Sequence, residues 1–307
     1  MNTVTGVTAV QAYEQAAQVL PLALRGPALR LSEGDKAVCE ELRLRMGQPL
    51  AAVLPGGEHL VEGTEVTLPL LEQMVELACQ ASLHTVLDSL RQGYLTLRGG
   101  HRMGVCGTVE LRQGEIHGFR TLASASIRIA RAVSGQGNWS GAELLRPDGR
   151  LYSTLILAPP GVGKTTLLRE LIRRAADGDG MAPQRVGLAD ERGEVAALWQ
   201  GRPQLPVGRR CDVVEGCSKA QGLMLLLRAM NPEILAADEI TAPGDGRALL
   251  IAAGCGVTLL STAHGQDRED LMRRPLYRPL VTQGLFQRLV TIERRGEERN
   301  YQVEVLS

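Results

Sequence analysis

The stretch LILAPPGVGKTTLLRE, residues 155–170, constrains the fold of this chain more than any other feature. Its first four residues are apolar, as is typical of a strand buried on both faces of a parallel sheet. The loop after them ends in Gly163-Lys164-Thr165, as phosphate-binding loops do, and a helical stretch follows. Ala158 stands where that pattern usually has its first glycine, a change that many nucleotide-binding proteins accept. Strand, loop and helix together predict an α/β domain with a parallel sheet and a phosphate-binding loop.

The residue types of this loop explain how it would hold phosphates. Its glycines let backbone N–H groups turn inward, and the helix N-terminus adds partial positive charge beside them. Lys164 is expected to reach the β- and γ-phosphates of ATP, and Thr165 to offer its hydroxyl to Mg²⁺. A chance Gly-Lys-Thr is the alternative, which the flanking strand and helix disfavour. The predicted ATP contacts are Pro159, Pro160, Gly161, Val162, Gly163, Lys164, Thr165 and Thr166.

A second apolar run, EILAADE, covers residues 233–239. Asp238 ends this predicted strand at the carboxyl edge of the sheet, where parallel sheets place ligands, and is expected to hold Mg²⁺ through water. Glu239 is placed to orient a water for attack on the γ-phosphate, so it is the predicted catalytic base. An isolated Asp-Glu at a strand end is commonly just solvated. Together with a P-loop, the pair favours ATP hydrolysis over phosphoryl transfer to a small molecule.

Two more strand ends carry polar side chains that we expect near the nucleotide. RVGLADERGE puts Asp190, Glu191 and Glu194 after a predicted strand. GVTLLSTAHG puts Thr262 and His264 after another. Parallel strands end at one edge, so Asp190 and Glu194 are further catalytic candidates, next in line as base after Glu239. His264 is expected to sense the γ-phosphate or to link hydrolysis to motion, although a hydrogen-bonded core histidine is an equal alternative.

Charge and cysteine content argue against several other classes. Lys+Arg and Asp+Glu both total 34, so no bulk charge indicates nucleic acid or anionic lipid as a partner. The 6 cysteines form no C-x-x-C pair, which is typical of thiols in a reducing compartment. The N-terminal residues lack the pattern of a secretory signal, and no run reads as a membrane span. We therefore expect a cytoplasmic protein that reaches a membrane only through partners.

The order of these motifs resembles that of the secretion and pilus ATPase superfamily. APPGVGKTT corresponds to its Walker A loop, LADERGE to its acidic box, ADEIT to its Walker B strand end and STAHG to its histidine box. Several stretches are similar to the stage III sporulation protein AA family in particular. They include ELRLRMGQPL, TLRGGHRMGVCGTV, SIRIARAVSG, GRRCDVVEGCSKAQG and RRPLYRPLVTQGLFQRLV.

This resemblance implies an ATPase in the mother-cell cytoplasm of an endospore-forming bacterium. Such a protein would work with ATP and Mg²⁺ at the base of a transenvelope channel between mother cell and forespore. The resemblance further implies a homo-hexameric ring, with membrane proteins of the channel as partners and no direct insertion into the membrane. Composition and periodicity say nothing of sporulation, which rests on the resemblance alone.

The pattern of elements divides the chain into two expected domains. Residues 1–135 read as a smaller α+β domain, and residues 140–307 alternate strand and helix as a RecA-like domain does. A linker is expected near 133–141, and a hairpin around RRGEERN closes the second domain. The expected elements of the first domain are helical structure near 8–25, a strand or hairpin in LRLRMGQPLAAVL, a helix from Thr67 to Gly93 and antiparallel strands over 94–131.

Arginines outside the P-loop are candidates for completing the active site. Arg128 and Arg131 lie in SIRIARAV, where the simplest interpretation is a solvated strand face. The alternative, implied by the superfamily, is that they reach the phosphates at a domain cleft. Arg210 and Arg228 precede the Walker B strand, and an arginine from there would instead be supplied to a neighbouring subunit. The sequence does not choose among the four.

Two other functions stay open. RecA-like cores also drive nucleic-acid-dependent motors, but the zero net charge and the lack of a basic, aromatic-bearing stretch argue against nucleic acid as a partner. TLRGGHRMG is the one local basic hairpin that could serve such a motor. A nucleotide-gated scaffold with little hydrolysis is the second alternative, and Glu239 argues against it.

Overall fold

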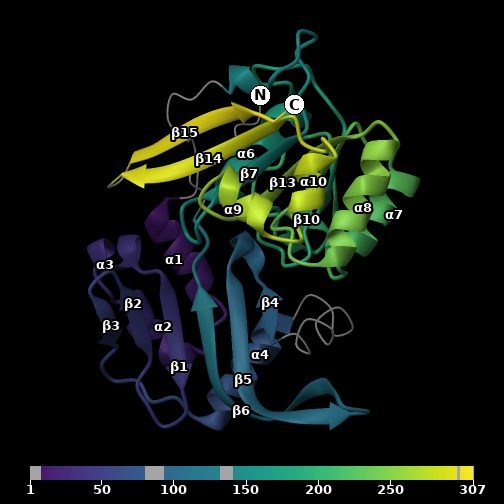
Figure 1. The fold of residues 1–307 in the computed structure, drawn as a ribbon. Helices are drawn as coiled ribbons and strands as arrows, with labels where there is room; N and C mark the ends of the chain where they lie inside the picture. The colour runs from purple at the N-terminus through teal and green to yellow at the C-terminus, as the bar shows by residue number, and fades with distance from the viewer. Residues whose placement is uncertain (1–7, 80–92, 132–140, 296–297, 307) are drawn as a thin grey trace. The chain divides into compact units, whose positions relative to one another are not determined.

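The computed structural model describes residues 8–79, 93–131, 141–295 and 298–306. Contacts divide the chain into two compact units (Figure 1). The N-terminal unit comprises Met1–Ala132 and Leu198–Gln204, and the C-terminal unit comprises Val133–Ala197 and Leu205–Ser307. A short antiparallel hairpin, β9 (Leu198–Trp199) with β10 (Arg202–Pro203), thus groups with the N-terminal unit. Most of the linker expected near 133–141 lies outside the described residues.

The N-terminal unit combines an antiparallel sheet with helices that share its core. The strand order is β3-β2-β1-β6-β5-β4. The strands are β1 (Glu41–Arg45), β2 (Ala51–Leu54), β3 (Gly57–Leu60), β4 (Tyr94–Thr96), β5 (Arg102–Arg112) and β6 (Glu115–Arg128). The helices are α1 (Ala9–Ala17), α2 (Leu22–Leu29), α3 (Glu33–Val38) and α4 (Leu68–Cys79). Tyr13 of α1, Leu42 of β1 and Met74 of α4 are fully buried in this core.

The region expected to be helical near 8–25 contains two helices. Residues 8–25 are divided between α1 and α2, because Pro21 has no N–H for a helix interior and stands instead as the N-cap residue of α2. The start of α1 is a capping box: the Thr8 hydroxyl accepts from the Gln11 N–H, and the Gln11 side chain accepts from the Thr8 N–H.

Other expectations for this unit are confirmed where the structure describes them. LRLRMGQPLAAVL contains the antiparallel pair β1 and β2, and residues 94–131 contain the antiparallel strands β4, β5 and β6. The helix expected after Thr67 begins at Leu68, and its continuation from residue 80 to Gly93 lies outside the described residues.

The C-terminal unit is built on a seven-stranded sheet in the order β11-β8-β12-β13-β7-β14-β15, in which only β15 is antiparallel to its neighbour. Its strands are β7 (Thr154–Ala158), β8 (Val186–Ala189), β11 (Cys211–Val214), β12 (Ile234–Ala237), β13 (Thr258–His264), β14 (Arg288–Arg295) and β15 (Glu298–Val305). Its helices are α6 (Lys164–Asp177), α7 (Lys219–Ala229), α8 (Pro243–Gly254), α9 (Arg268–Arg273) and α10 (Arg278–Thr282).

Helices cover both faces of this sheet, which explains its uninterrupted apolar strands. Alternate residues of a strand point to opposite faces. Ile156 of β7 therefore packs in one core with residues of α6, whereas Leu155 and Leu157 pack in another with residues of α7 and α8. Figure 1 shows α7 and α8 side by side. Of the helices that the structure describes, none has both the length and the apolar content to cross a bilayer.

The strand order brings the predicted motifs to one edge. β13 lies between β7, which leads into the P-loop, and β12, which ends before the Walker B pair. His264 pairs in register with Ala158, the last residue before the loop. β8, which leads into the acidic box, lies on the other side of β12. The predicted C-terminal hairpin is confirmed as β14 and β15, which extends the sheet beyond β7.

Candidate active site

The P-loop joins β7 to α6. Two of its glycines have a backbone conformation that other residues rarely adopt. Gly161 has a φ of +75° and Gly163 a φ of +116°. A Cβ at Gly163 would also lie 2.9 Å from Nε of Arg299, so the site has little room for a side chain. These turns bring the loop to the N-terminus of α6, which begins at Lys164. Unpaired N–H groups and the helix dipole at such a terminus favour an anion.

The Lys164 side chain is held by three acceptors. Its ammonium donates to the carbonyl oxygens of Ala158 at 2.8 Å and Pro159 at 3.0 Å. The third contact is Nδ1 of His264 at 2.8 Å. Only 7% of Lys164 is exposed. Burial lowers the pKa of this lysine, and the two carboxylates after β12 oppose that shift.

His264 links the lysine to Glu239. An ammonium can only donate, so Nδ1 of His264 accepts from Lys164 and the ring proton lies on Nε2. Nε2 is 2.9 Å from Oε1 of Glu239. The neutral imidazole therefore accepts at one nitrogen and donates at the other. We call the series Lys164, His264 and Glu239 the relay.

Asp238 is fixed by hydroxyl groups from two other segments. Its Oδ2 accepts from the Thr165 hydroxyl at 2.7 Å, and its Oδ1 accepts from the Thr262 hydroxyl at 2.6 Å. Mg²⁺ prefers oxygen ligands and is usually held by one or two protein groups together with phosphate. The hydroxyl of Thr165, at the start of α6, is hydrogen-bonded to the carboxylate of Asp238. These two oxygen donors are therefore close enough to serve as ligands of one Mg²⁺ ion.

Glu239 has a strained backbone. Its φ of +33° lies in the left-handed region, which costs a residue with a side chain about 1–3 kcal/mol. Two hydrogen bonds hold it there, because its N–H reaches Oγ1 of Thr262 at 2.8 Å and Oδ1 of Asp238 at 3.1 Å. Such strain persists where the surroundings fix a side chain in one direction. Here that direction is toward His264.

Asp190, a predicted catalytic residue, turns its carboxylate toward the backbone of its own loop. Its oxygens accept from the N–H groups of Glu194 at 2.9 Å, Val195 at 3.1 Å and Ala196 at 2.8 Å. Burial raises the pKa of Asp190, and these backbone bonds oppose the shift. The geometry favours a structural task for Asp190, namely to shape the acidic box.

The acidic box and the Walker B pair line one small cavity. Glu191 in this cavity forms an ion pair with Lys219, a residue of α7 that is 5% exposed. The full lining is Asp190, Glu191, Arg192, Glu194, Lys219, Asp238, Glu239 and Thr241. The sequence-predicted carboxylates are thus brought together, and their individual roles stay predictions.

The candidate arginines have separate surroundings. Arg128 is exposed at the end of β6. Arg131 is half-buried and donates through Nη2 to the carbonyl oxygen of Cys39 at 2.5 Å, within the N-terminal unit. Arg210 precedes β11, at the edge of the sheet opposite the P-loop, and donates to the Ala176 carbonyl at 3.0 Å. Their proposed contacts with phosphate or a neighbouring subunit stay predictions.

Three basic residues at the site were missed by the sequence interpretation. Arg169 of α6 donates to the carbonyl oxygens of residues 194 and 195 at 2.7 and 2.6 Å, and so supports the acidic box. Arg299 of β15 donates to the Val162 carbonyl of the P-loop at 2.8 Å. Lys219 follows Ser218, whose capping box with Gln221 begins α7. That Ser-Lys-Ala-Gln pattern was the available signal for Lys219, because it places the lysine in a first helical turn.

The fold and this site define a class, the secretion and pilus ATPase fold with a P-loop. The structure matches the Legionella pneumophila ATPase DotB with a TM-score of 0.58 and 16% identity, over 100% of this chain and 83% of that chain. It matches the pilus retraction motor PilT with bound ADP at a TM-score of 0.57 and 16% identity, over 87% of this chain and 79% of that chain. At such identities the likeness concerns the fold.

The sequence comparisons give the family. The family model for sporulation stage III, protein AA, matches residues 11–303. The stage III sporulation protein AA of Bacillus subtilis (strain 168) is 37% identical over 286 residues, which cover 91% of each chain. This chain belongs to the stage III sporulation protein AA family, as its motifs predicted. A more distant relative, the uncharacterized protein ycf45 of Porphyra purpurea, is 25% identical over 87% of this chain and 43% of that protein.

Proposed function

We propose that this chain is a Mg²⁺-dependent ATP hydrolase that powers or assembles a transenvelope channel between mother cell and forespore. The observation that carries the hydrolase is the relay, because it ties the P-loop lysine to a carboxylate able to take a proton. Family membership and the fold shared with secretion and pilus motors support the channel.

The lysine is poised to exchange partners. Two of its three acceptors are carbonyl oxygens of its own loop. An anionic phosphate oxygen is a stronger acceptor for an ammonium than a neutral carbonyl, so Lys164 would turn to the β- and γ-phosphates of ATP. Thr165 and Asp238 would hold Mg²⁺, which when bound neutralises charge that develops on the phosphates.

Glu239 is the proposed general base. His264 occupies Oε1 of this carboxylate, and the described residues provide no partner for Oε2. Oε2 is therefore available to accept a proton from the attacking water. When Lys164 turns toward a γ-phosphate, it releases Nδ1 of His264, and the imidazole is free to re-aim the carboxylate. The relay would in this way report whether a γ-phosphate is present.

The wider proposal concerns assembly. We infer a homo-hexameric ring on the mother-cell side of the membrane, attached through membrane proteins of the channel. The shared fold with secretion motors supports it. Light scattering with and without ATP tests it, since the proposal expects ATP to shift the full-length chain from monomer to ring.

The direct test of the function is phosphate release by the full-length chain, measured with and without single-stranded DNA. We expect Mg²⁺-dependent release that DNA does not stimulate and that Lys164→Ala abolishes. Stimulation by DNA would favour the nucleic-acid-dependent motor. Tight ATP binding without any release under single-turnover conditions would favour the nucleotide-gated scaffold.

A further inference from the structure

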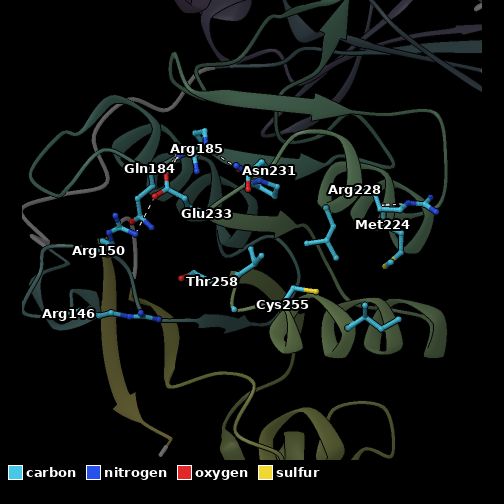
Figure 2. Close-up of a pocket in the computed structure, with 15 residues that line it drawn as sticks. Arg146, Arg150, Gln184, Arg185, Met224, Arg228, Asn231, Glu233, Cys255 and Thr258 are labelled. Atoms are coloured by element: carbon cyan, nitrogen blue, oxygen red, sulfur yellow. Dashed lines mark hydrogen bonds and ion pairs between the residues drawn. The ribbon is translucent and has the colours of Figure 1, made fainter.

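The C-terminal unit has a second cavity, at the edge of the sheet where the strands begin (Figure 2). Arg185, Glu233 and Val257 line it, and each directly precedes a strand: β8, β12 or β13. The volume is about 590 Å³, within the range in which proteins hold ligands. Arg228 is the one lining residue that the sequence offered as a candidate for a neighbouring subunit's active site. The other lining residues lie apart from the candidate active site, which is where the same strands end.

The lining has a marked excess of positive charge. It contains four arginines, at positions 146, 150, 185 and 228, against one glutamate. Glu233 lies 3.3 Å from Arg150 and 3.4 Å from Arg185, and so holds both guanidinium groups on one wall. Arg146 and Arg228 have no carboxylate partner within the described parts of the chain. Arg150 is also 3.9 Å from Asp148, which is not itself a lining residue. With Asp148 and Glu233 set against the four arginines, the cavity keeps two unbalanced positive charges.

Two helix ends oppose this charge without cancelling it. α7 and α8 both end beside the cavity, at Ala229 and Gly254. A helix C-terminus carries roughly half a negative charge, so the two together offset about one of the two positive charges. The cavity therefore still favours an anionic ligand.

The cavity is also partly apolar, which argues against a small inorganic anion as its natural ligand. Figure 2 shows Met224 on the side of Arg228, with Cys255 between it and the wall of Arg150. Ile251, at the rim, is 51% exposed. The apolar lining is completed by Leu227, Pro232 and Val257. A ligand that covers this surface needs apolar groups close to its negative charges.

We propose that this cavity docks an acidic peptide segment of a partner protein, with carboxylates on the arginines and an apolar side chain against Met224 and Ile251. One polypeptide would then complement both the arginines and the apolar side chains of the cavity. β12 (Ile234–Ala237) connects Glu233 at this cavity to Asp238 at the active site, so the docked segment would lie at the other end of the Walker B strand. The proposal concerns binding and does not depend on ATP hydrolysis.

A native cysteine gives the test. Cys255 lines the cavity and is exposed, and Cys106, exposed on β5 of the N-terminal unit, is an internal reference. The full-length chain without nucleotide is alkylated with iodoacetamide in the presence of the synthetic peptide Ac-EELEELEE-NH₂. We expect the peptide to slow alkylation of Cys255 at least tenfold and to leave Cys106 unchanged. A peptide with lysine in place of glutamate should protect neither cysteine.

Matched variants decide whether the effect belongs to the cavity. Arg228→Glu should raise the peptide concentration needed for protection at least tenfold. Arg273→Glu, which reverses an arginine with 78% of its side chain exposed on α9, should not. Equal weakening by both variants, or no protection of Cys255, would overturn the proposal. So would protection by phosphatidylglycerol vesicles but not by peptide, or protection that follows protein concentration without peptide, which would assign the cavity to lipid or to a second copy of the chain.

Discussion

Ionisable side chains are buried in two regions of this molecule, and they are held in opposite ways. At the carboxyl edge of the seven-stranded sheet, Lys164, His264 and Glu239 bond to one another across segments that are distant in sequence. In the N-terminal unit, His101 and Arg131 bond to backbone: His101 Nδ1 accepts from the Ala130 N–H at 3.1 Å, and Arg131 donates to the Cys39 carbonyl. His264 is partly exposed, whereas His101 is buried.

The difference distinguishes ionisable side chains expected to take part in the reaction from those that stabilise the fold. Burial lowers the pKa of His101 to about 4, so this ring stays neutral near pH 7 and serves the fold. Burial also lowers the pKa of Lys164, but there the carboxylates of Glu239 and Asp238 oppose the shift and solvent reaches the group's neighbours. Substitutions in the first region should therefore change ATP binding or turnover, and substitutions in the second should change stability.

The largest effect is expected for Lys164→Ala. Hydrogen bonds to charged groups contribute about 1.5–3 kcal/mol each, so loss of the ammonium should weaken ATP binding at least about 100-fold by calorimetry. Lys36→Ala removes another buried lysine, which pairs with Glu14 in the N-terminal unit, and should leave ATP affinity unchanged. Retained ATP affinity in the first variant would contradict the P-loop assignment.

His264→Asn should act on turnover alone. Asparagine can bond to Lys164 or to Glu239 but is too short to bridge both, so the relay is broken while the P-loop is kept. We expect turnover to fall about 10- to 100-fold, with ATP affinity and the urea midpoint of unfolding little changed. Turnover within twofold of wild type would contradict this prediction and favour the alternative that His264 is a hydrogen-bonded core residue.

His101→Asn should change how stability depends on pH. The folded pKa of about 4 lies below the unfolded value of 6.5, so the unfolded chain binds a proton first as the pH falls. His101 therefore costs no stability above pH 6.5, and its cost grows until the pH reaches about 4. Between pH 7 and pH 5 the wild type should lose about 2 kcal/mol through this group, and the variant should not.

Urea unfolding at both pH values measures this difference. His59→Asn, at an exposed histidine of β3, is the control and should leave the pH dependence unchanged. If His101→Asn loses as much stability on acidification as wild type does, the histidine is not the group responsible.

Arg131→Met should have the smallest effect of these variants. Loss of its bond to the Cys39 carbonyl should cost about 1–2 kcal/mol of unfolding free energy and leave turnover near wild type. Arg128→Met, at an exposed position, should barely change stability, so any loss of turnover there would support the predicted closing arginine. A loss of turnover at unchanged stability in Arg131→Met would instead support contact of that arginine with phosphate.

The sequence alone predicted those features that depend on the pattern of neighbouring residues along the chain. The all-apolar runs at 155–158 and 234–237 predicted parallel strands, and parallel strands must end at one edge, so the convergence of their polar ends followed. The division at Pro21 was also predictable from the missing N–H of proline, although the apolar spacing of residues 8–25 does not show it.

Features that depend on tertiary packing were not predictable. Whether Asp190 faces a water or the amides of residues 194–197 is decided by the path of its loop, which spacing does not report. The same holds for Arg299, which reaches the P-loop only because β15 and β14 extend the sheet beyond β7. The left-handed backbone of Glu239 depends on a hydroxyl of Thr262 from another strand.

The most direct test of the central claim is single-turnover phosphate release by Glu239→Gln, with ATP binding measured on the same sample. Glutamine keeps the shape of the side chain but cannot accept the proton, so release should slow at least about 100-fold while ATP affinity stays within twofold. Glu269→Gln, at an exposed glutamate of α9, should behave as wild type. Release within a few-fold of wild type at full ATP occupancy would contradict the claim and make Glu194 the next candidate for the base, since the carboxylate of Asp190 is bonded to the amides of its own loop.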